Sequence, residues 1–136
     1  WLKIGSKVSI MNSKKHDTVF SMTSHLPHLI AYNLVKTATD FEKQQKYELI
    51  KFSAGGLRDF SRIAASNEIM WRDIFFDNKK NIIKTINLFI ENLVLFKKDI
   101  ILQNKKSMIK KLTETKKIRK KIIRLKQDVD KPDFGR

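Results

Sequence analysis

The sequence contains no cysteine, and it has only two prolines and four glycines among its 136 residues. The absence of cysteine excludes disulfides, zinc–thiolate sites and thiol catalysis, and it is compatible with a reducing compartment, so we predict a cytoplasmic protein. Lysine and asparagine interrupt every hydrophobic segment, and no segment approaches the roughly 18 apolar residues needed to cross a bilayer. We therefore expect no membrane span, and no signal peptide is visible.

Acidic residues are scarce relative to basic ones, 14 against 29, which gives a formal net charge of +15. Much of the excess lies between Lys105 and Arg124, where lysines and arginines are interleaved with apolar residues at helical spacing. This pattern is typical of the solvated face of an amphipathic helix. The alternative interpretation is that this segment binds nucleic acid or an acidic partner. It is the weaker one, because the sequence lacks the aromatic and glycine-rich motifs that recognise nucleic acids.

The apolar periodicity predicts an all-α fold of about five to six helices, of which the last two are long. Asn12 or Ser13 is expected to cap the first helix and Asp40 the second, and Pro27 is expected to kink the first. The predicted helices span residues 14–35, 40–52, 57–65, a short stretch after Ser66 or Asn67, 79–102 and 106–126.

The two ends of the chain differ from this helical middle. Residues 1–4 and Gly5 are typical of a last helical turn and its cap, and residues 7–11 alternate like a short strand, a step that usually belongs to an α/β unit. We predict three segments: an α/β remnant at 1–12, a helical domain at 13–127 and a tail at 128–136. Apolar residues cover more than one face of 79–102, which a helical homodimer would bury.

Three histidines, His16, His25 and His28, fall within thirteen residues. His25 and His28 are three residues apart and therefore neighbours on one helical face, if the turn survives Pro27. The spacing permits a metal pair, but a zinc site needs a third and usually a fourth ligand, and no His–Glu helix motif accompanies the pair. Histidines that serve only packing at a kinked helix remain the other interpretation.

The segment from Ser53 to Arg62 places two glycines before a short helix that carries Arg58, Asp59 and Arg62. Asp59 is three residues before Arg62, so its carboxylate can steer the guanidinium. A guanidinium binds a carboxylate through two parallel hydrogen bonds, a geometry suited to holding a small dicarboxylate substrate in one orientation. A plain surface ion pair is the alternative, and the glycine pair alone is too weak to indicate a nucleotide loop.

Two blocks of residues resemble the signatures of prephenate dehydrogenases, which include the arogenate and cyclohexadienyl dehydrogenases. The first is His16-Asp17 followed by Ser24-His25-Leu26-Pro27-His28. The second runs from Ser53-Ala54-Gly55-Gly56-Leu57-Arg58-Asp59 to Ser66 and continues in Met70-Trp71-Arg72-Asp73-Ile74. The closing Lys131-Pro132-Asp133-Phe134-Gly135-Arg136 is similar to the tails of bacterial cyclohexadienyl dehydrogenases. The resemblance covers essentially the whole chain.

The resemblance implies NAD- or NADP-dependent oxidative decarboxylation of prephenate or arogenate in tyrosine biosynthesis. In the family, hydride leaves ring C4 for the nicotinamide while the ring carboxylate departs as carbon dioxide, and aromatisation drives the reaction. The family's catalytic histidine and its glycine-rich dinucleotide loop belong to an upstream nucleotide-binding domain, for which this sequence has no counterpart. The resemblance therefore implies a homodimeric helical part that is inactive alone.

The resemblance also implies roles for individual residues. Arg62 would hold a substrate carboxylate, with Asp59 restraining it, and Gly55 would line the pocket. His28 would face the substrate side chain, and Trp71 would close or buttress the pocket. His25 and His16 would have supporting roles in positioning and packing.

Overall fold

The computed structural model describes residues 1–6 and 8–127, and every regular element within them is helical. The prediction of an all-α fold is therefore confirmed for the described residues. The chain divides into two compact units, Trp1–Ile86 and Asn87–Arg136, and each is described here by itself. The sequence motif at 131–136 lies outside the described residues.

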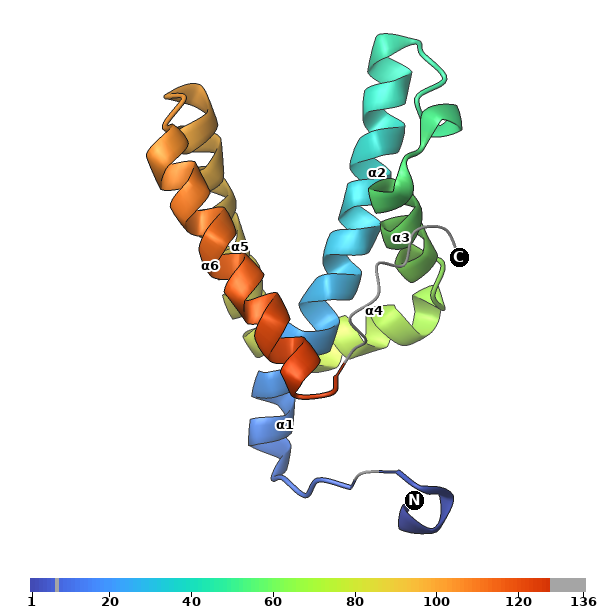
Figure 1. Ribbon diagram of the computed structural model, residues 1–136. Helices are drawn as coiled ribbons and strands as arrows, with labels where there is room; N and C mark the ends of the chain where they lie inside the picture. Colours follow the sequence, from blue (N-terminus) through green and yellow to red (C-terminus); the bar gives the residue numbers. More distant parts are fainter. Residues whose placement is uncertain (7, 128–136) are drawn as a thin grey trace. The chain divides into compact units, whose positions relative to one another are not determined.

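The first unit is built around one long helical path. The path begins with α1 (Ser13–Phe20), continues through the π-helical turn η2 (Ser21–His25) and ends with α2 (Leu26–Gln45). The other elements are the 3-10 turns η1 (Leu2–Ile4) and η3 (Ile50–Phe52), and the helices α3 (Gly55–Ala64), α4 (Glu68–Asp77) and the start of α5 (Lys79–Ile101). Helices α2 and α3 lie side by side (Figure 1).

Side-chain caps begin these helices where the sequence predicts them. The Asn12 side chain accepts a hydrogen bond from the Lys15 amide at 2.8 Å, and the Asn67 side chain accepts one from the Met70 amide at 2.8 Å. Each bond satisfies an amide that has no partner inside its own helix. At the other end of α2, Lys46 adopts a left-handed conformation with φ of 58° and closes the helix.

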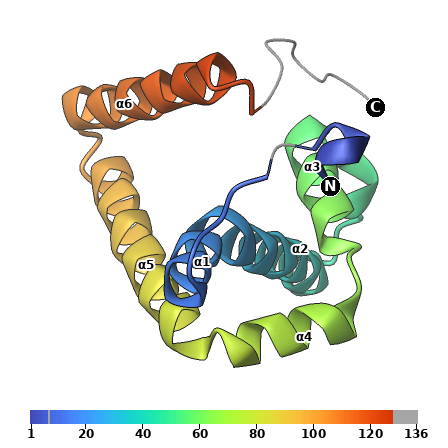
Figure 2. The same ribbon diagram turned by 90° about the horizontal axis from the view of Figure 1, so that it is seen from below.

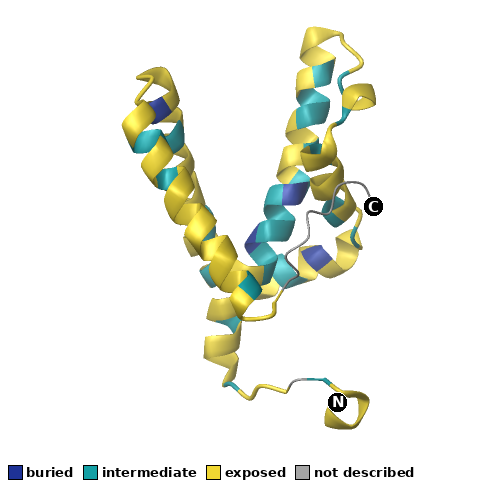
Figure 3. Cartoon of the chain, viewed as in Figure 1, coloured by how far each residue is buried: buried dark blue, intermediate teal, exposed yellow. Residues whose placement is uncertain are grey.

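The buried residues of the first unit gather where η2, α2, α4 and the start of α5 meet (Figure 3). The apolar ones are Leu26, Ala31, Trp71 and Ile82, and the polar ones are Ser21 and Asn78. This core is small, so individual contacts within it carry a large share of the packing. It also coincides with the segment that holds the paired histidines.

The second unit contains the end of α5 and helix α6 (Lys105–Arg124). Seen from below, α6 leaves α5 at an angle after the turn (Figure 2). The Asn104 side chain caps α6 by accepting from the Ser107 amide at 3.1 Å. Next to this turn the largely buried Asp99 accepts hydrogen bonds from Ser107 Oγ, at 2.8 Å, and from Lys111 Nζ. No helix in the described part of the chain is long and apolar enough to cross a membrane.

Two predicted elements are wrong. Residues 8–11 form no strand, and Lys7 lies outside the described residues; a strand needs a neighbour for its amides and carbonyls, and the described residues offer none. The predicted helix 40–52 does not begin at Asp40, because α2 continues to Gln45. Within α2 the Asp40 carboxylate pairs with Lys36 one turn earlier instead of capping a new helix.

The irregularity expected at Pro27 lies just before it, in the π-helical turn η2, and Pro27 itself occupies the first turn of α2. A proline is tolerated there because amides of a first helical turn lack intrahelical acceptors. π-helical turns inside α-helices occur frequently at functional sites. The turn ends at His25, which leads to the candidate site.

Candidate functional site

A cluster of aromatic rings from three elements forms the candidate functional site. Trp71, on α4, is 6% exposed and stacks on the His28 ring of α2, with ring centroids 3.7 Å apart and an interplanar angle of 21°. His25, at the end of η2, meets the same indole edge-on at 6.2 Å and 76°. Phe75, one turn after Trp71 on α4, packs on the indole with ring centroids 5.5 Å apart. The structure therefore brings together His25, His28 and Trp71 from two distant blocks of sequence.

A buried asparagine ties His25 to the rest of the unit. The Asn78 side-chain nitrogen donates to the Asp17 carbonyl at 2.7 Å and lies 3.2 Å from His25 Nδ1. The Asn78 side-chain oxygen accepts from Asn81 at 2.7 Å. Asn78 is 9% exposed and follows α4 directly, so one helix and its cap hold both histidine rings. Sequence reasoning missed Asn78, since only its position seven residues after Trp71 indicates a shared face.

The environment of His25 favours a neutral ring. Burial lowers its pKa most, the neighbouring His16 and His28 lower it further when they are charged, and Asp17 opposes them by raising it. His16 itself is exposed, lies 3.1 Å from the Asp17 carboxylate through Nδ1, and packs on Phe20 with ring centroids 4.4 Å apart. His16 thus acts on the site through charge and packing and does not join the ring cluster.

The indole N–H of Trp71 is buried and has no hydrogen-bond acceptor among the described residues. Leaving such a donor unmet costs about 1–3 kcal/mol. A ligand oxygen, or an acceptor from a second copy of the chain, would remove that cost. The cluster therefore has unused hydrogen-bonding capacity next to two imidazoles.

Helix α3 holds the second predicted block against α2. The Tyr32 hydroxyl, one turn after His28, donates to the Ser66 carbonyl at 2.7 Å and so fixes the loop that follows Arg62. Arg62 is exposed on α3. Asp59 is exposed too, and within the part of the chain that the structure describes the two side chains form no ion pair with each other. The guanidinium is therefore not restrained by Asp59 here and stays available to a carboxylate.

Gly55 lies at the first position of α3, where a Cβ atom would meet nothing within 4 Å. Nothing in the described chain therefore requires glycine at this position for steric reasons. A close approach by a ligand or by a second chain would supply such a reason. The role of Gly55 as a pocket residue therefore stays a prediction from the family resemblance.

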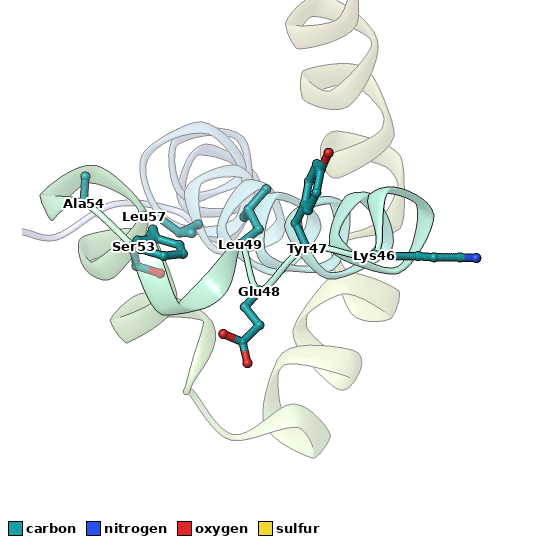
Figure 4. Close-up of a pocket in the computed structure, with 8 residues that line it drawn as sticks. Lys46, Tyr47, Glu48, Leu49, Ser53, Ala54 and Leu57 are labelled. Carbon is teal, nitrogen blue, oxygen red and sulfur yellow. The ribbon is translucent and has the colours of Figure 1, made fainter.

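A separate hollow of the first unit lies where α2 ends and α3 begins. It has a volume of about 610 Å³ and is lined by Lys46, Tyr47, Glu48, Leu49, Phe52, Ser53, Ala54 and Leu57. In the close-up the Lys46 and Glu48 side chains extend away from each other (Figure 4), and Glu48 pairs with Lys51 instead. The hollow contains no imidazole and no converging polar groups, so the ring cluster is the better candidate site. No group of three or more metal-ligating side chains occurs within residues 1–6 and 8–127.

Residues 12–114 match the family described as the dimerization domain of prephenate dehydrogenase. The chain belongs to the prephenate dehydrogenase family. The match includes every predicted site residue, from His16 to Trp71. It also includes the whole of α5, the helix whose apolar surface suggested a dimer.

Relatives of the chain agree in sequence and in structure. It is 34% identical to a cyclohexadienyl dehydrogenase of Zymomonas mobilis over 130 residues, which are 96% of this chain and 43% of the relative. It is 40% identical to a prephenate dehydrogenase of Bacillus subtilis over 84 residues, 61% of this chain and 22% of the relative. A crystal structure of prephenate dehydrogenase from Aquifex aeolicus, in complex with hydroxyphenyl propionate and NAD+, matches 90% of this chain and 42% of its own length, with a TM-score of 0.82 and 39% identity. The chain therefore spans less than half of each of these relatives.

Proposed function

We propose that this chain is the substrate-binding and dimerisation part of an NAD- or NADP-dependent dehydrogenase that converts prephenate to 4-hydroxyphenylpyruvate or arogenate to tyrosine. The observation that carries the proposal is the convergence of His25 and His28 on the buried Trp71, in a chain of this family. The domain assignment goes with it: a short segment at 1–12, the helical domain at 13–127 and a tail at 128–136. We place the protein in the cytoplasm.

The substrate would be held between α3 and the ring cluster. Arg62 would bind one carboxylate with its planar guanidinium. His28 would face the substrate side chain, and Gly55 would line the pocket. Trp71 would form a wall whose N–H can donate to a substrate oxygen, and a wall of this kind excludes water and strengthens the charged contacts.

A nicotinamide bound elsewhere in the full-length protein would supply the hydride acceptor for this chemistry. The described chain has no glycine-rich phosphate loop, so its residues do not fit a dinucleotide. The Aquifex aeolicus structure contains NAD+, which supports nicotinamide dependence of the relative. We assign cofactor binding to the portion of the relatives that this chain does not span, and the catalytic histidine to the same portion.

The test uses the full-length protein that carries this chain. NADH or NADPH formation is measured with prephenate and with arogenate. Arg62→Ala should raise KM about 10- to 100-fold, since loss of a hydrogen bond to a charged group costs about 1.5–3 kcal/mol. Arg58→Ala, one turn earlier on the same helix, is the control and should change KM little. Absence of turnover with both substrates would refute the proposal.

A second candidate function rests on α6, which carries ten basic residues and one acidic residue. Lys117, Lys120 and Arg124 line a hollow of about 570 Å³ on this helix together with Ile123. A nucleic-acid or acidic-protein site would show affinity that falls steeply as salt is added. The dehydrogenase assignment predicts only weak retention on DNA, so a salt titration of DNA binding separates the two functions.

A further inference from the structure

The hydrogen bonds around His25 identify which of its ring nitrogens carries the proton. The Asn78 side chain lies 2.7 Å from the Asp17 carbonyl, an acceptor that cannot donate. The Asn78 group facing that carbonyl must therefore be its NH2 group, and the Asn78 oxygen faces Asn81, which donates to it. The orientation of the Asn78 amide follows from these two partners without reference to His25.

The same NH2 group is 3.2 Å from His25 Nδ1. An NH2 group can only donate, so the contact is attractive only if His25 Nδ1 carries a lone pair. The proton of the neutral ring must then be on Nε2. Burial lowers the pKa of His25, which keeps the ring neutral near pH 7 and preserves this arrangement.

His28 has the opposite arrangement. Its Nδ1 lies 3.0 Å from the Ser24 carbonyl, which can only accept. The proton of the neutral His28 ring is therefore on Nδ1, and its Nε2 carries the lone pair. Stacking on Trp71 at 3.7 Å holds this ring in place.

We propose that Asn78 is a positioning residue that fixes His25 as the Nε2–H tautomer, while the Ser24 carbonyl fixes His28 as the Nδ1–H tautomer. The two rings on Trp71 then present one hydrogen-bond donor and one acceptor. No partner in the described part of the chain meets either Nε2 atom. The ligand suited to this pair carries an acceptor oxygen for His25 and a hydroxyl or ammonium donor for His28. That this ligand is the dehydrogenase substrate rests on the proposed function.

Long-range ¹H–¹⁵N spectra of the ¹⁵N-labelled 136-residue chain at about pH 7.5 test the proposal directly. The chain has three histidines, so His16→Gln identifies the His16 pattern and His28→Gln identifies the His28 pattern, which leaves the third pattern to His25. We expect His25 to show protonated Nε2 and His28 to show protonated Nδ1. An Nδ1–H pattern for His25 in the unmodified chain would overturn the proposal without any variant.

Asn78→Asp supplies the second readout. A carboxylate accepts from Nδ1–H, so the His25 pattern should change to Nδ1–H or to the doubly protonated ring, while the His28 pattern stays the same. Asn33→Asp, which adds the same charge at an exposed position of α2, is the matched control and should leave the His25 pattern as it is. A His25 pattern unchanged by Asn78→Asp would contradict a positioning role, since a residue that only packs would leave the tautomer alone.

In the full-length protein, Asn78→Asp should lower kcat/KM about tenfold or more, consistent with about 1.4 kcal/mol for one misoriented hydrogen bond. The spectra test the tautomer assignment and the turnover measurements test the proposed function, so either result can be negative without the other. If the spectra are as expected but the unmodified protein turns over neither prephenate nor arogenate, the tautomer assignment stands and the proposed function falls. If turnover is normal and His25 has its proton on Nδ1, the reverse holds.

Discussion

Each of the two units is stabilised internally by side-chain hydrogen bonds, and these bonds join residues at very different separations in sequence. In the first unit, side-chain hydrogen bonds join residues far apart in sequence: Asn78 to Asp17 over 61 positions, Asn78 to His25 over 53 and Tyr32 to Ser66 over 34. In the second unit, the bonds from Lys111 to Leu95 and Asp99 span 16 and 12 positions. The first unit is a tertiary assembly, whereas the second is a local helical turn.

The difference also appears in which apolar residues are covered. Both units leave large apolar side chains exposed, but every buried apolar residue among the described ones lies in the first unit: Leu26, Ala31, Trp71 and Ile82. The exposed apolar side chains of the second unit include Leu88, Ile90, Leu93, Val94, Leu95, Ile100, Ile101, Leu102, Ile109, Leu112, Ile118 and Leu125. Extended apolar surface of this kind marks protein interfaces. The comparison indicates that the first unit forms the candidate site and that the second is suited to association.

Trp71→Ala should have the largest effect and should be confined to the first unit. The substitution removes the ring against which both histidines pack, and truncating a buried tryptophan costs about 3–5 kcal/mol. Denaturant unfolding followed by circular dichroism measures the loss. Trp1→Ala, at a position 84% exposed, is the control with an expected change near zero.

Amide hydrogen exchange shows which helices lose stability in Trp71→Ala. Protection should decrease in η2, α4 and the start of α2 and remain in the turn between α5 and α6. An equal loss of amide protection in both units would contradict the proposed difference between them, because it would mean that the ring cluster also stabilises the second unit.

Leu93→Lys should have the next largest effect, on association. Leu93 is 55% exposed on α5, and in the proposed homodimer a lysine there would bury an unpaired charge. Weakening of the dimer by about 100-fold, or 2–3 kcal/mol, is expected from the cost of such a charge. Sedimentation analysis should show dissociation at micromolar concentration.

Asn92→Lys adds the same charge one position earlier and a quarter turn away on the helix, and it should weaken the dimer less. A monomeric unmodified chain at high concentration would contradict the assignment of the second unit as an interface.

Acidification should loosen the turn between α5 and α6 in the second unit. The hydrogen bond from Lys111 is the main reason that the pKa of Asp99 lies below its ordinary value. Because the folded pKa is below the unfolded one, Asp99 stabilises the turn fully above about pH 4, and this contribution is lost as the pH falls through the depressed folded value. Amide exchange over 99–111 should accelerate below that pH.

The matched variants separate this carboxylate from others. Asp99→Asn should abolish the acid-dependent change in the turn, and Glu114→Gln, on the exposed face of α6, should leave it. An acid response unchanged in Asp99→Asn would show that another group controls the turn.

Much of the fold could be predicted from the sequence because helix starts and stops are local. At two helix starts one of the two predicted capping residues is confirmed, Asn12 rather than Ser13 and Asn67 rather than Ser66. The last two helices begin and end within about two residues of their predicted bounds. The error at Asp40 has a physical cause: its carboxylate can cap a helix or pair with Lys36 along one, and the sequence alone does not show which wins.

The site was predictable only in part. Helical spacing alone predicted that His25 and His28 are neighbours, but their meeting with Trp71 came from the family resemblance. Periodicity reports contacts within one element, whereas Trp71 and Asn78 reach the histidines across the fold. The polar network through Asn78 was therefore invisible before the structure.

The smallest effects concern Lys46 and Gln103, two of the three described residues that adopt a left-handed conformation without being glycine. Lys46 has φ of 58° at the end of α2, and Gln103 has φ of 48° between α5 and α6. A left-handed conformation costs a non-glycine residue about 1–2 kcal/mol, and glycine gives back part of this through its greater unfolded entropy. Lys46→Gly and Gln103→Gly should each stabilise by about 0.5–1 kcal/mol.

The two gains should appear in different places, because each turn belongs to its own unit. Hydrogen exchange should slow at the end of α2 in Lys46→Gly and around Asn104 in Gln103→Gly, and the double variant should show the sum of the two gains, as expected for independent sites. Lys43→Gly, inside α2, is the control and should destabilise by about 1 kcal/mol. A gain in the second unit from Lys46→Gly would mean that the units share stability, which their separate hydrogen-bond networks argue against.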